Sequence, residues 1–173
     1  MINQTTIRNA FTVVLIIIFA IEASAQVPSI TLRTVDGGNF NLTDNRGKVI
    51  VLAFGATWVP LSSKELPALQ KLADRYAGRK VDFHWVSINS LKAGARTSAT
   101  DTELKAFATK SGLKLSVLRD PDQAAYRALG VDALPTLVII DRDGKVAHKH
   151  VGFDPDQADG YGEVSQMLDK LLK

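Results

Sequence analysis

An unbroken apolar run from Val49 to Phe54 is followed, after a short turn, by a helical pattern. The run does not alternate between apolar and polar positions, which is typical of a strand covered on both faces of its sheet. Beyond the turn, Leu66, Leu69 and Ala73 recur at the spacing of one helix face. A buried strand that leads directly into a helix indicates an α/β fold, in which functional residues usually lie at such turns.

Strand and helix patterns alternate along most of the chain. Strands are predicted at residues 30–33, 40–42, 49–54, 81–89, 113–118, 137–140 and 146–151. Helices are predicted after Ser62, after Thr100, after Asp120 and across residues 164–171. Thr100 and Glu103 form a capping box at the start of the second of these helices. Pro121 stands at the first helical position of the third. This order predicts a mostly parallel central sheet with helices on both faces and an antiparallel edge hairpin.

The first 25 residues have the pattern of a secretory signal peptide. Arg8 precedes an apolar run at residues 10–21, and Ala23-Ser24-Ala25 forms a small-residue cleavage site. The run is shorter than the ~20 residues that a transmembrane helix needs, and an uncleaved membrane anchor is the alternative. We therefore predict cleavage near Ala25, one domain at residues 26–173, no stable membrane anchor after cleavage, and a periplasmic or extracellular location.

The composition excludes some classes of function. The 173 residues include 21 Lys and Arg and 18 Asp and Glu, which gives a formal net charge of +3. The basic residues are scattered among acidic ones rather than gathered in a stripe, so no nucleic-acid partner is predicted. The chain contains no cysteine, so it neither forms disulfides nor exchanges them through a thiolate.

The segment from Phe54 to Pro67 resembles the active-site segment of thioredoxin-like proteins, in particular the exported TlpA/redoxin (AhpC/TSA-like) branch. The pattern of that branch reads roughly F-W-A-T-W-C-P-P-C-x-x-E-x-P. The positions that match it are Thr57, Trp58, Pro60, Glu65 and Pro67. The two cysteine positions hold Val59 and Ser62 instead.

A second resemblance surrounds Pro135. Residues 130–146 are similar to the redoxin pattern around the cis-proline of the family. The resemblance implies the thioredoxin fold with an N-terminal β extension over residues 26–173. It also implies a cis Leu134–Pro135 bond beside the turn, and a Leu134 backbone that pairs with an extended peptide. A cis-proline that only shapes a turn is the alternative.

The chemistry of the family depends on its two cysteines. A thiolate at a helix N-terminus attacks a disulfide, and the second cysteine resolves the mixed disulfide. The isopropyl group of Val59 is inert, and the hydroxyl of Ser62 stays protonated unless a base activates it. Ala53 and Gly55 also replace a buried carboxylate and a tryptophan of thioredoxin itself. No catalytic residue is therefore predicted.

We predict a non-catalytic module that binds a protein or peptide partner in a groove beside the proline. The groove is predicted to contain Trp58, Val59, Pro60, Leu61, Leu134 and Pro135. Exposed apolar residues at a helix start favour a binding surface, and packing of this loop against its neighbours is the alternative. The alternative function is thiol-disulfide oxidoreductase activity, which family assignment alone implies. This alternative is possible only if the cysteines of an active parent were lost or replaced in this chain.

Serine and histidine residues supply the remaining candidates. A nucleophilic Ser62 would need a base, and neither a G-x-S-x-G motif nor a nearby histidine is present, so Ser62 and Ser63 are expected to cap the helix. His148 and His150 share one face of a predicted strand. The sequence shows no third ligand beside them, so a solvated face, no metal and no cofactor are predicted. His84 is expected to be a structural histidine with its hydrogen bonds satisfied.

Overall fold

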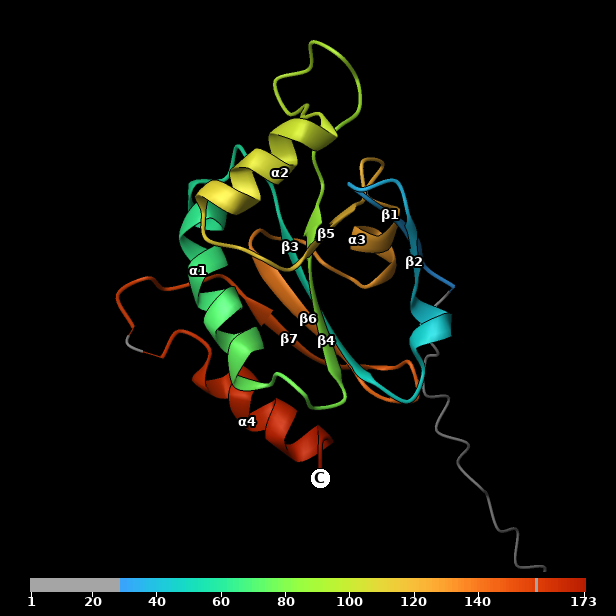
Figure 1. Ribbon diagram of the computed structural model, residues 1–173, viewed down its shortest axis with the longest axis vertical. Coiled ribbons are helices and arrows are strands. Elements are labelled where there is room, and N and C mark those ends of the chain that lie inside the picture. The colour runs from blue at the N-terminus through green and yellow to red at the C-terminus, as the bar shows by residue number, and fades with distance from the viewer. Residues whose placement is uncertain (1–28, 158) are drawn as a thin grey trace, which may run out of the picture.

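The computed structural model describes residues 29–157 and 159–173, which form one mixed β-sheet with helices on both faces (Figure 1). The predicted signal peptide, residues 1–25, and its cleavage site lie outside the described residues. No helix in the described ranges combines the length and the apolar composition needed to cross a membrane.

The sheet contains seven strands within the described residues. They are β1 (Thr31–Thr34), β2 (Asn39–Asn41), β3 (Val49–Gly55), β4 (Val81–Ser87), β5 (Ser116–Arg119), β6 (Thr136–Ile140) and β7 (Val146–Val151). The helices are α1 (Pro60–Arg75), α2 (Asp101–Lys110), α3 (Ala124–Ala128) and α4 (Gly162–Leu171), and a 3-10 turn, η1 (Leu42–Asn45), follows β2.

The strand order is β2-β1-β5-β4-β3-β6-β7. β3 is parallel to β4 and β4 is parallel to β5, whereas the outer strand pairs are antiparallel. This parallel centre with an N-terminal β hairpin and an antiparallel β6–β7 hairpin confirms the predicted α/β fold. Because β3 and β6 are antiparallel, with Phe54 opposite Thr136, β3 ends where β6 begins.

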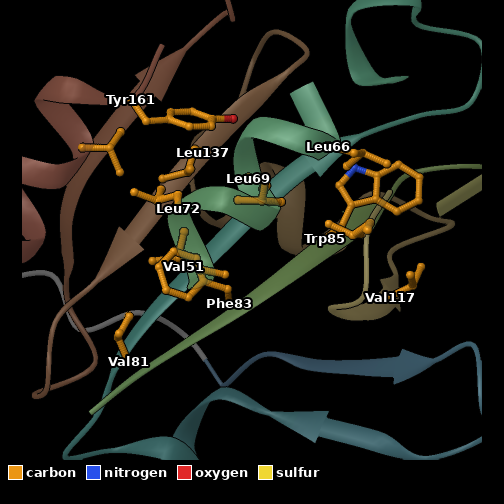
Figure 2. Packing of buried hydrophobic residues seen from close by; sticks show 14 of the residues in the cluster. Val51, Leu66, Leu69, Leu72, Val81, Phe83, Trp85, Val117, Leu137 and Tyr161 are labelled. Atoms are coloured by element: carbon orange, nitrogen blue, oxygen red, sulfur yellow. The ribbon is translucent and has the colours of Figure 1, made fainter. Parts of the chain in front are cut away.

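β3 is covered on both faces, as its unbroken apolar sequence predicts. Val51 points into a core cluster that includes Leu66 and Leu69 of α1 (Figure 2). The next residue, Leu52, points into a second cluster that includes Ala125 of α3. Burial of each large aliphatic side chain contributes roughly 2 kcal/mol, so the two clusters together hold the end of β3 in place without a disulfide.

Helix α3 begins later than the sequence predicts. Pro121 precedes the helix, which starts at Ala124 after Gln123 has taken a left-handed conformation with φ of 58°. The carboxylate of Asp120 accepts the N–H group of Ala125 at 3.1 Å. An ordinary N-cap side chain accepts an N–H group two or three residues further along the chain. Asp120 instead accepts one five residues further along, so the usual cap spacing does not predict where this helix begins.

The prediction that His84 has its hydrogen bonds satisfied is wrong. Its ring lies 4.5 Å from the ring of Phe40, measured between centroids. Neither ring nitrogen has a hydrogen-bond partner among the described residues. Burial disfavours the charged imidazole and lowers the pKa of His84 to about 4, although the charge of Asp82 opposes this change.

Candidate peptide-binding site

The turn between β3 and α1 lies where the sequence places it. The N–H group of Val59 donates to the carbonyl of Ala56 at 3.1 Å, and the N–H group of Ser62 donates to the carbonyl of Val59 at 3.0 Å. Val59 is the N-cap of α1 and Pro60 is the first helical residue, a position that does not need a backbone N–H group. Val59 and Ser62, at the two cysteine positions of the family, are thus about one helical turn apart.

Ser62 is buried beneath the turn and does not cap the helix, contrary to the prediction. Its Oγ accepts the N–H group of Ala56 at 3.1 Å, and the hydroxyl of Ser63 donates to the carbonyl of Pro60 at 3.0 Å. Gly55 passes so close that a Cβ there would lie 2.8 Å from the Oγ of Ser62. Within the described part of the chain, Ser62 bonds no histidine or carboxylate, so no base is placed to activate it.

Asn89, which belongs to no recognisable sequence motif, holds the turn from the side. Its Oδ1 accepts the N–H group of Thr57 at 3.1 Å, and its Nδ2 donates to the Oγ1 of Thr57 at 2.7 Å. The Oδ1 atom also accepts the hydroxyl of Ser87 at 2.8 Å. Because Asn89 is fully buried, this network favours a single conformation of the turn.

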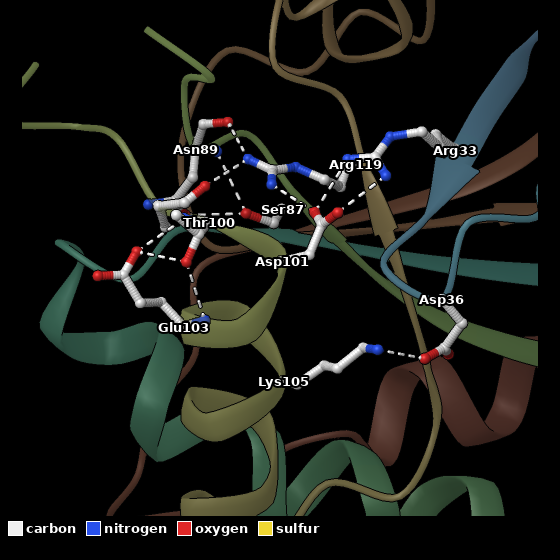
Figure 3. Close-up of polar contacts among 10 residues, drawn as sticks. Arg33, Asp36, Ser87, Asn89, Thr100, Asp101, Glu103, Lys105 and Arg119 are labelled. Atoms are coloured by element: carbon white, nitrogen blue, oxygen red, sulfur yellow. Dashed lines mark hydrogen bonds and ion pairs between the residues drawn. The ribbon is translucent and has the colours of Figure 1, made fainter. Parts of the chain in front are cut away.

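Arg119 at the end of β5 connects Asn89 to the start of α2 (Figure 3). Its guanidinium donates to the carbonyls of Asn89 and Ala99 at 3.3 and 2.7 Å, and to the Oδ1 of Asp101 at 2.6 Å. Arg33 donates two further hydrogen bonds to Asp101 at 2.8 and 2.9 Å. The bond from Arg33, with a contribution from Arg119, lowers the pKa of Asp101. These contacts fix the loop between β4 and α2 beside the turn.

The Leu134–Pro135 bond is cis, as predicted, and lies beside the turn because β6 begins where β3 ends. The carbonyl of Pro135 accepts the N–H group of Gly152 at 2.8 Å. Leu134 makes no backbone–backbone hydrogen bond to another residue that the structure describes. The side chains of Leu134 and Val59 pack against the same core cluster. The backbone of Leu134 is therefore available to pair with an extended peptide.

Exposed apolar side chains gather at this end of the sheet. Trp58 within the turn is 39% exposed, and Leu91 in the loop after β4 is exposed as well. Val151, which is 58% exposed, lies opposite the first residue of β6. Exposed apolar side chains at one end of a sheet favour a binding surface there. Of the other predicted groove residues, Pro60 is exposed, Val59, Leu61 and Leu134 are partly buried, and Pro135 is buried.

Four cavities of the described residues are lined by other parts of the fold. One of about 360 Å³ lies between α1 and the loop before α4, with Lys71 and Phe153 in its lining. Three others lie between β1 and α3, between α1 and α2, and beside β5. None of these four is lined by Trp58 or Pro135. The predicted groove is therefore distinct from these cavities. It is a surface that offers the unpaired backbone of Leu134 and nearby exposed apolar side chains.

Glu65 on α1 is buried in the same helix that starts at the turn. Its Oε1 accepts the hydroxyl of Tyr161 at 2.7 Å, and its Oε2 has no hydrogen-bond partner among the described residues. Burial raises the pKa of Glu65 to about 8, and the hydrogen bond from Tyr161 opposes that rise. The carboxyl group of Glu65 is therefore mostly protonated at neutral pH. The position of the buried thioredoxin carboxylate is different: it is occupied here by Ala53, which is buried and apolar.

Glu65→Gln is expected to remove a pH-dependent loss of stability. The pKa of Glu65 is about 8 in the folded protein and 4.5 without burial, so the stabilisation is complete below pH 4.5 and is lost as the pH rises toward 8. The full shift corresponds to roughly 5 kcal/mol, which is the upper limit of the expected loss of stability. Urea unfolding at pH 5 and pH 8.5 measures this difference for both proteins.

Subtraction of the two pH profiles isolates Glu65, because all other groups titrate in both proteins. Tyr161→Phe is the matched variant, since it removes the hydrogen bond that lowers the pKa of Glu65. Without this hydrogen bond the pKa of Glu65 should be higher. The free energy of unfolding of Tyr161→Phe should therefore continue to fall up to a higher pH than that of the wild type. Parallel profiles for wild type and Glu65→Gln would contradict a buried, protonated carboxyl group.

Comparison with known proteins identifies the family of the chain. The model of the Redoxin family matches residues 22–171. The chain belongs to the Redoxin family. Thiol-disulfide oxidoreductase ResA of Bacillus anthracis is 31% identical over 141 residues, which cover 81% of this chain and 76% of ResA. Thioredoxin-like protein YneN of Bacillus subtilis (strain 168) is 31% identical over 134 residues, covering 76% of this chain and 73% of YneN.

Solved structures agree with this assignment. The exposed lipoprotein thioredoxin Etrx1 of Streptococcus pneumoniae strain TIGR4 superposes with a TM-score of 0.62 and 26% identity, covering 82% of this chain and 99% of Etrx1. A thiol:disulfide interchange protein of Chlorobium tepidum TLS shares the fold, with a TM-score of 0.64 and 23% identity over 86% of this chain and 96% of that protein. The resemblance predicted from the two motifs is confirmed.

This Redoxin-family member shares the fold of similar proteins but contains no cysteine. The similar protein ResA is named as a thiol-disulfide oxidoreductase, and in thiol-disulfide exchange a thiolate is the attacking group. This chain contains no cysteine and carries Val59 and Ser62 at the cysteine positions. Its turn, its cis-proline and the open backbone of Leu134 are present without the reacting groups.

Proposed function

We propose that this Redoxin-family protein is an exported, non-catalytic module that binds extended segments of a partner protein or peptide beside Pro135. The observation that carries the proposal is the unpaired backbone of Leu134, next to a turn that has no thiol. A peptide in strand conformation can form main-chain hydrogen bonds with that backbone without any covalent step.

The surroundings of Leu134 suit such a ligand. Trp58 offers an amphipathic aromatic surface, and Val151 offers apolar surface on the opposite side of Pro135. Val59 presents an isopropyl group where the family has a thiolate, so contact with the bound segment stays reversible. Asn89 and Arg119 hold the turn in one conformation before binding, which reduces the entropic penalty of association.

Export is the second part of the proposal. The N-terminal segment has a positive start, an apolar run and the cleavage pattern Ala23-Ser24-Ala25. The similar protein Etrx1 is named as an exposed lipoprotein. A chain that relies on core packing rather than on disulfides folds equally well in an oxidising compartment. We therefore place the mature protein outside the cytoplasm, in the periplasm or the extracellular space.

Thiol-disulfide oxidoreductase activity is the second candidate function. The name of the similar protein ResA favours it, and the turn geometry around Val59 and Ser62 is compatible with it. This activity is possible only if the chain derives from an active parent protein whose two cysteines were lost or replaced. For the chain as it stands, binding without exchange is the function that fits both the retained surface and the missing thiols.

Trp58→Ala is expected to weaken peptide binding by about 2 kcal/mol, or roughly 30-fold, which is the usual effect of removing a buried aromatic anchor. The probe is an array of extended peptides in which serine replaces every cysteine, so that no binding depends on disulfide chemistry. The affinity of the best-binding peptide is then measured by fluorescence anisotropy for wild type and variant.

Val146→Ala is the matched control for this experiment. Val146 is another exposed apolar residue, but it lies at the other end of β7, opposite Ile140. Its replacement should leave the affinity unchanged. Equal binding by wild type and Trp58→Ala would place the interface elsewhere on the protein.

A further inference from the structure

Two imidazoles and a carboxylate meet between β7 and α4. One ligand atom from each of His148, His150 and Glu163 lies within 4.8 Å of the other two. We propose that these three side chains form a binding site for a divalent transition metal ion, with Zn²⁺ as the metal that suits them best. This site uses other side chains than the surface around Pro135, although His150 precedes Val151 in β7, and it does not depend on the proposed peptide binding.

The fold brings the three residues together from two elements. His148 and His150 alternate with Lys149, and they pair with residues of β6 that belong to the core beneath α1 and α4. The Nζ of Lys149 instead donates to the carbonyl of Gly130 at 2.9 Å. Glu163 lies in the first turn of α4. The prediction of a solvated histidine pair without a third ligand is therefore wrong.

The distances suit metal coordination better than hydrogen bonding. The Nε2 of His148 lies 3.7 Å from Oε1 of Glu163, and the Nδ1 of His150 lies 3.7 Å from Oε2. Both distances are too long for an N–H···O hydrogen bond. In a tetrahedral site with metal–ligand distances near ~2.1 Å, neighbouring ligand atoms are about 3.4 Å apart. The two distances involve different oxygens of Glu163, and one ligand atom from each residue lies within 4.8 Å of the other two. Rotation of these side chains is needed to bring the three ligand atoms to one ion.

One of the nitrogen ligands has no other partner. The Nε2 of His148 is buried and makes no hydrogen bond to any residue that the structure describes. A buried polar atom in this state is unfavourable, and coordination of an ion by its lone pair removes the penalty. The ring of Tyr161 packs edge-on against His150, with 5.8 Å between centroids, which restricts the orientation of that imidazole. The Glu163 side chain is 68% exposed, so an ion can enter from solvent.

The chemistry of the ligands selects the metal. Two imidazoles and one carboxylate are the ligand set of three-residue zinc sites, in which water takes the fourth position. Ca²⁺ and Mg²⁺ prefer sites built from oxygen ligands. Because the ligands come from both β7 and α4, a bound ion links the start of α4 to the sheet. Metal binding is therefore expected to stabilise the folded protein.

The test is titration of the protein, purified without a histidine tag and treated with a chelator, with ZnCl₂ in a calorimeter. One equivalent of Zn²⁺ is expected to bind, and the thermal unfolding midpoint should rise in its presence. Glu163→Gln and His150→Ala should each weaken binding at least about tenfold, since even outer-shell changes at zinc sites have effects of this size. Co²⁺ should give the visible absorption of a tetrahedral ion in the wild type and lose it in both variants.

Lys149→Gln is the matched control, because Lys149 lies between the two histidines on the opposite face. It should bind Zn²⁺ as tightly as the wild type. Glu163→Gln alters an exposed side chain, so its result does not depend on refolding of the core. Absence of Zn²⁺ binding by the wild type, or equal affinity in wild type and Glu163→Gln, would overturn the proposed site.

Discussion

Replacement of Val59 and Ser62 together by cysteine is expected to give the protein a disulfide-exchange activity that the wild type lacks. The two residues are joined by a backbone hydrogen bond of 3.0 Å and lie one helical turn apart. Their Cα atoms are then roughly 5–6 Å apart, within the range that a disulfide accepts. Gly55 has no side chain to meet the group at position 62, whereas a Cβ there would lie only 2.8 Å from the Oγ of Ser62.

The introduced thiol at position 59 would lie at the N-terminus of α1, where the helix dipole and free N–H groups stabilise a thiolate and lower its pKa. Reduction of insulin by dithiothreitol is the assay. We expect no acceleration by the wild type and clear acceleration by the double variant. Val59→Cys combined with Ser62→Ala is the matched control, since it can form a mixed disulfide but has no second thiol to resolve it.

Two results would contradict this expectation. If the pair stays reduced under mild oxidant or links only between molecules, the turn does not have the geometry of the family. If the disulfide forms but never exchanges, the fold is correct and the surface no longer presents a substrate. Turnover by the repurified wild type would instead overturn the non-catalytic function.

Arg119→Met is expected to destabilise the protein by about 3 kcal/mol or more, because it breaks a buried charge network. The side chain of Arg119 is only 1% exposed and donates to Asp101, Asn89 and Ala99. Its removal leaves the carbonyls of Asn89 and Ala99 without this donor. Urea unfolding measures the free energy change, and peptide affinity should fall as well, because Asn89 holds the turn.

Arg33→Met is the control for the loss of a guanidinium beside Asp101. The side chain of Arg33 is 41% exposed, and an ion pair in contact with solvent contributes at most about 1 kcal/mol. The two variants remove the same charge from the same carboxylate and differ mainly in burial. Similar losses of stability in both would contradict the assignment of Arg119 as the central residue of the network.

Patterns among residues that are close in sequence predicted the principal strands, helices and turns of this protein. The unbroken run at residues 49–54 required burial on both faces, and the structure places it inside the sheet, between β4 and β6. The Thr100–Glu103 capping box, which depends only on three-residue spacing, is present as predicted. The turn after β3 and the proline before β6 were found because each motif is contiguous in sequence.

Contacts between distant residues could not be predicted in the same way. Asn89 bonds Thr57 across 32 positions, and nothing in its neighbours in sequence marks it as a support for the turn. The spacing of Ser62 in a helix start suggests a cap, but the tight approach of β3 directs its hydroxyl to Ala56 instead. Glu163 joins the two histidines of β7 only because α4 packs back onto the sheet.

The most direct test of the proposed function is mapping of the bound peptide by amide chemical shifts. The isotope-labelled wild type is titrated with the best-binding cysteine-free peptide from the array. The open backbone of Leu134 and the exposed Trp58 predict saturable shifts at residues 56–61 and 133–136, with new protection of the Leu134 amide from exchange. Shifts confined to other parts of the protein, or no saturable shifts at residues 133–136, would contradict peptide binding beside Pro135.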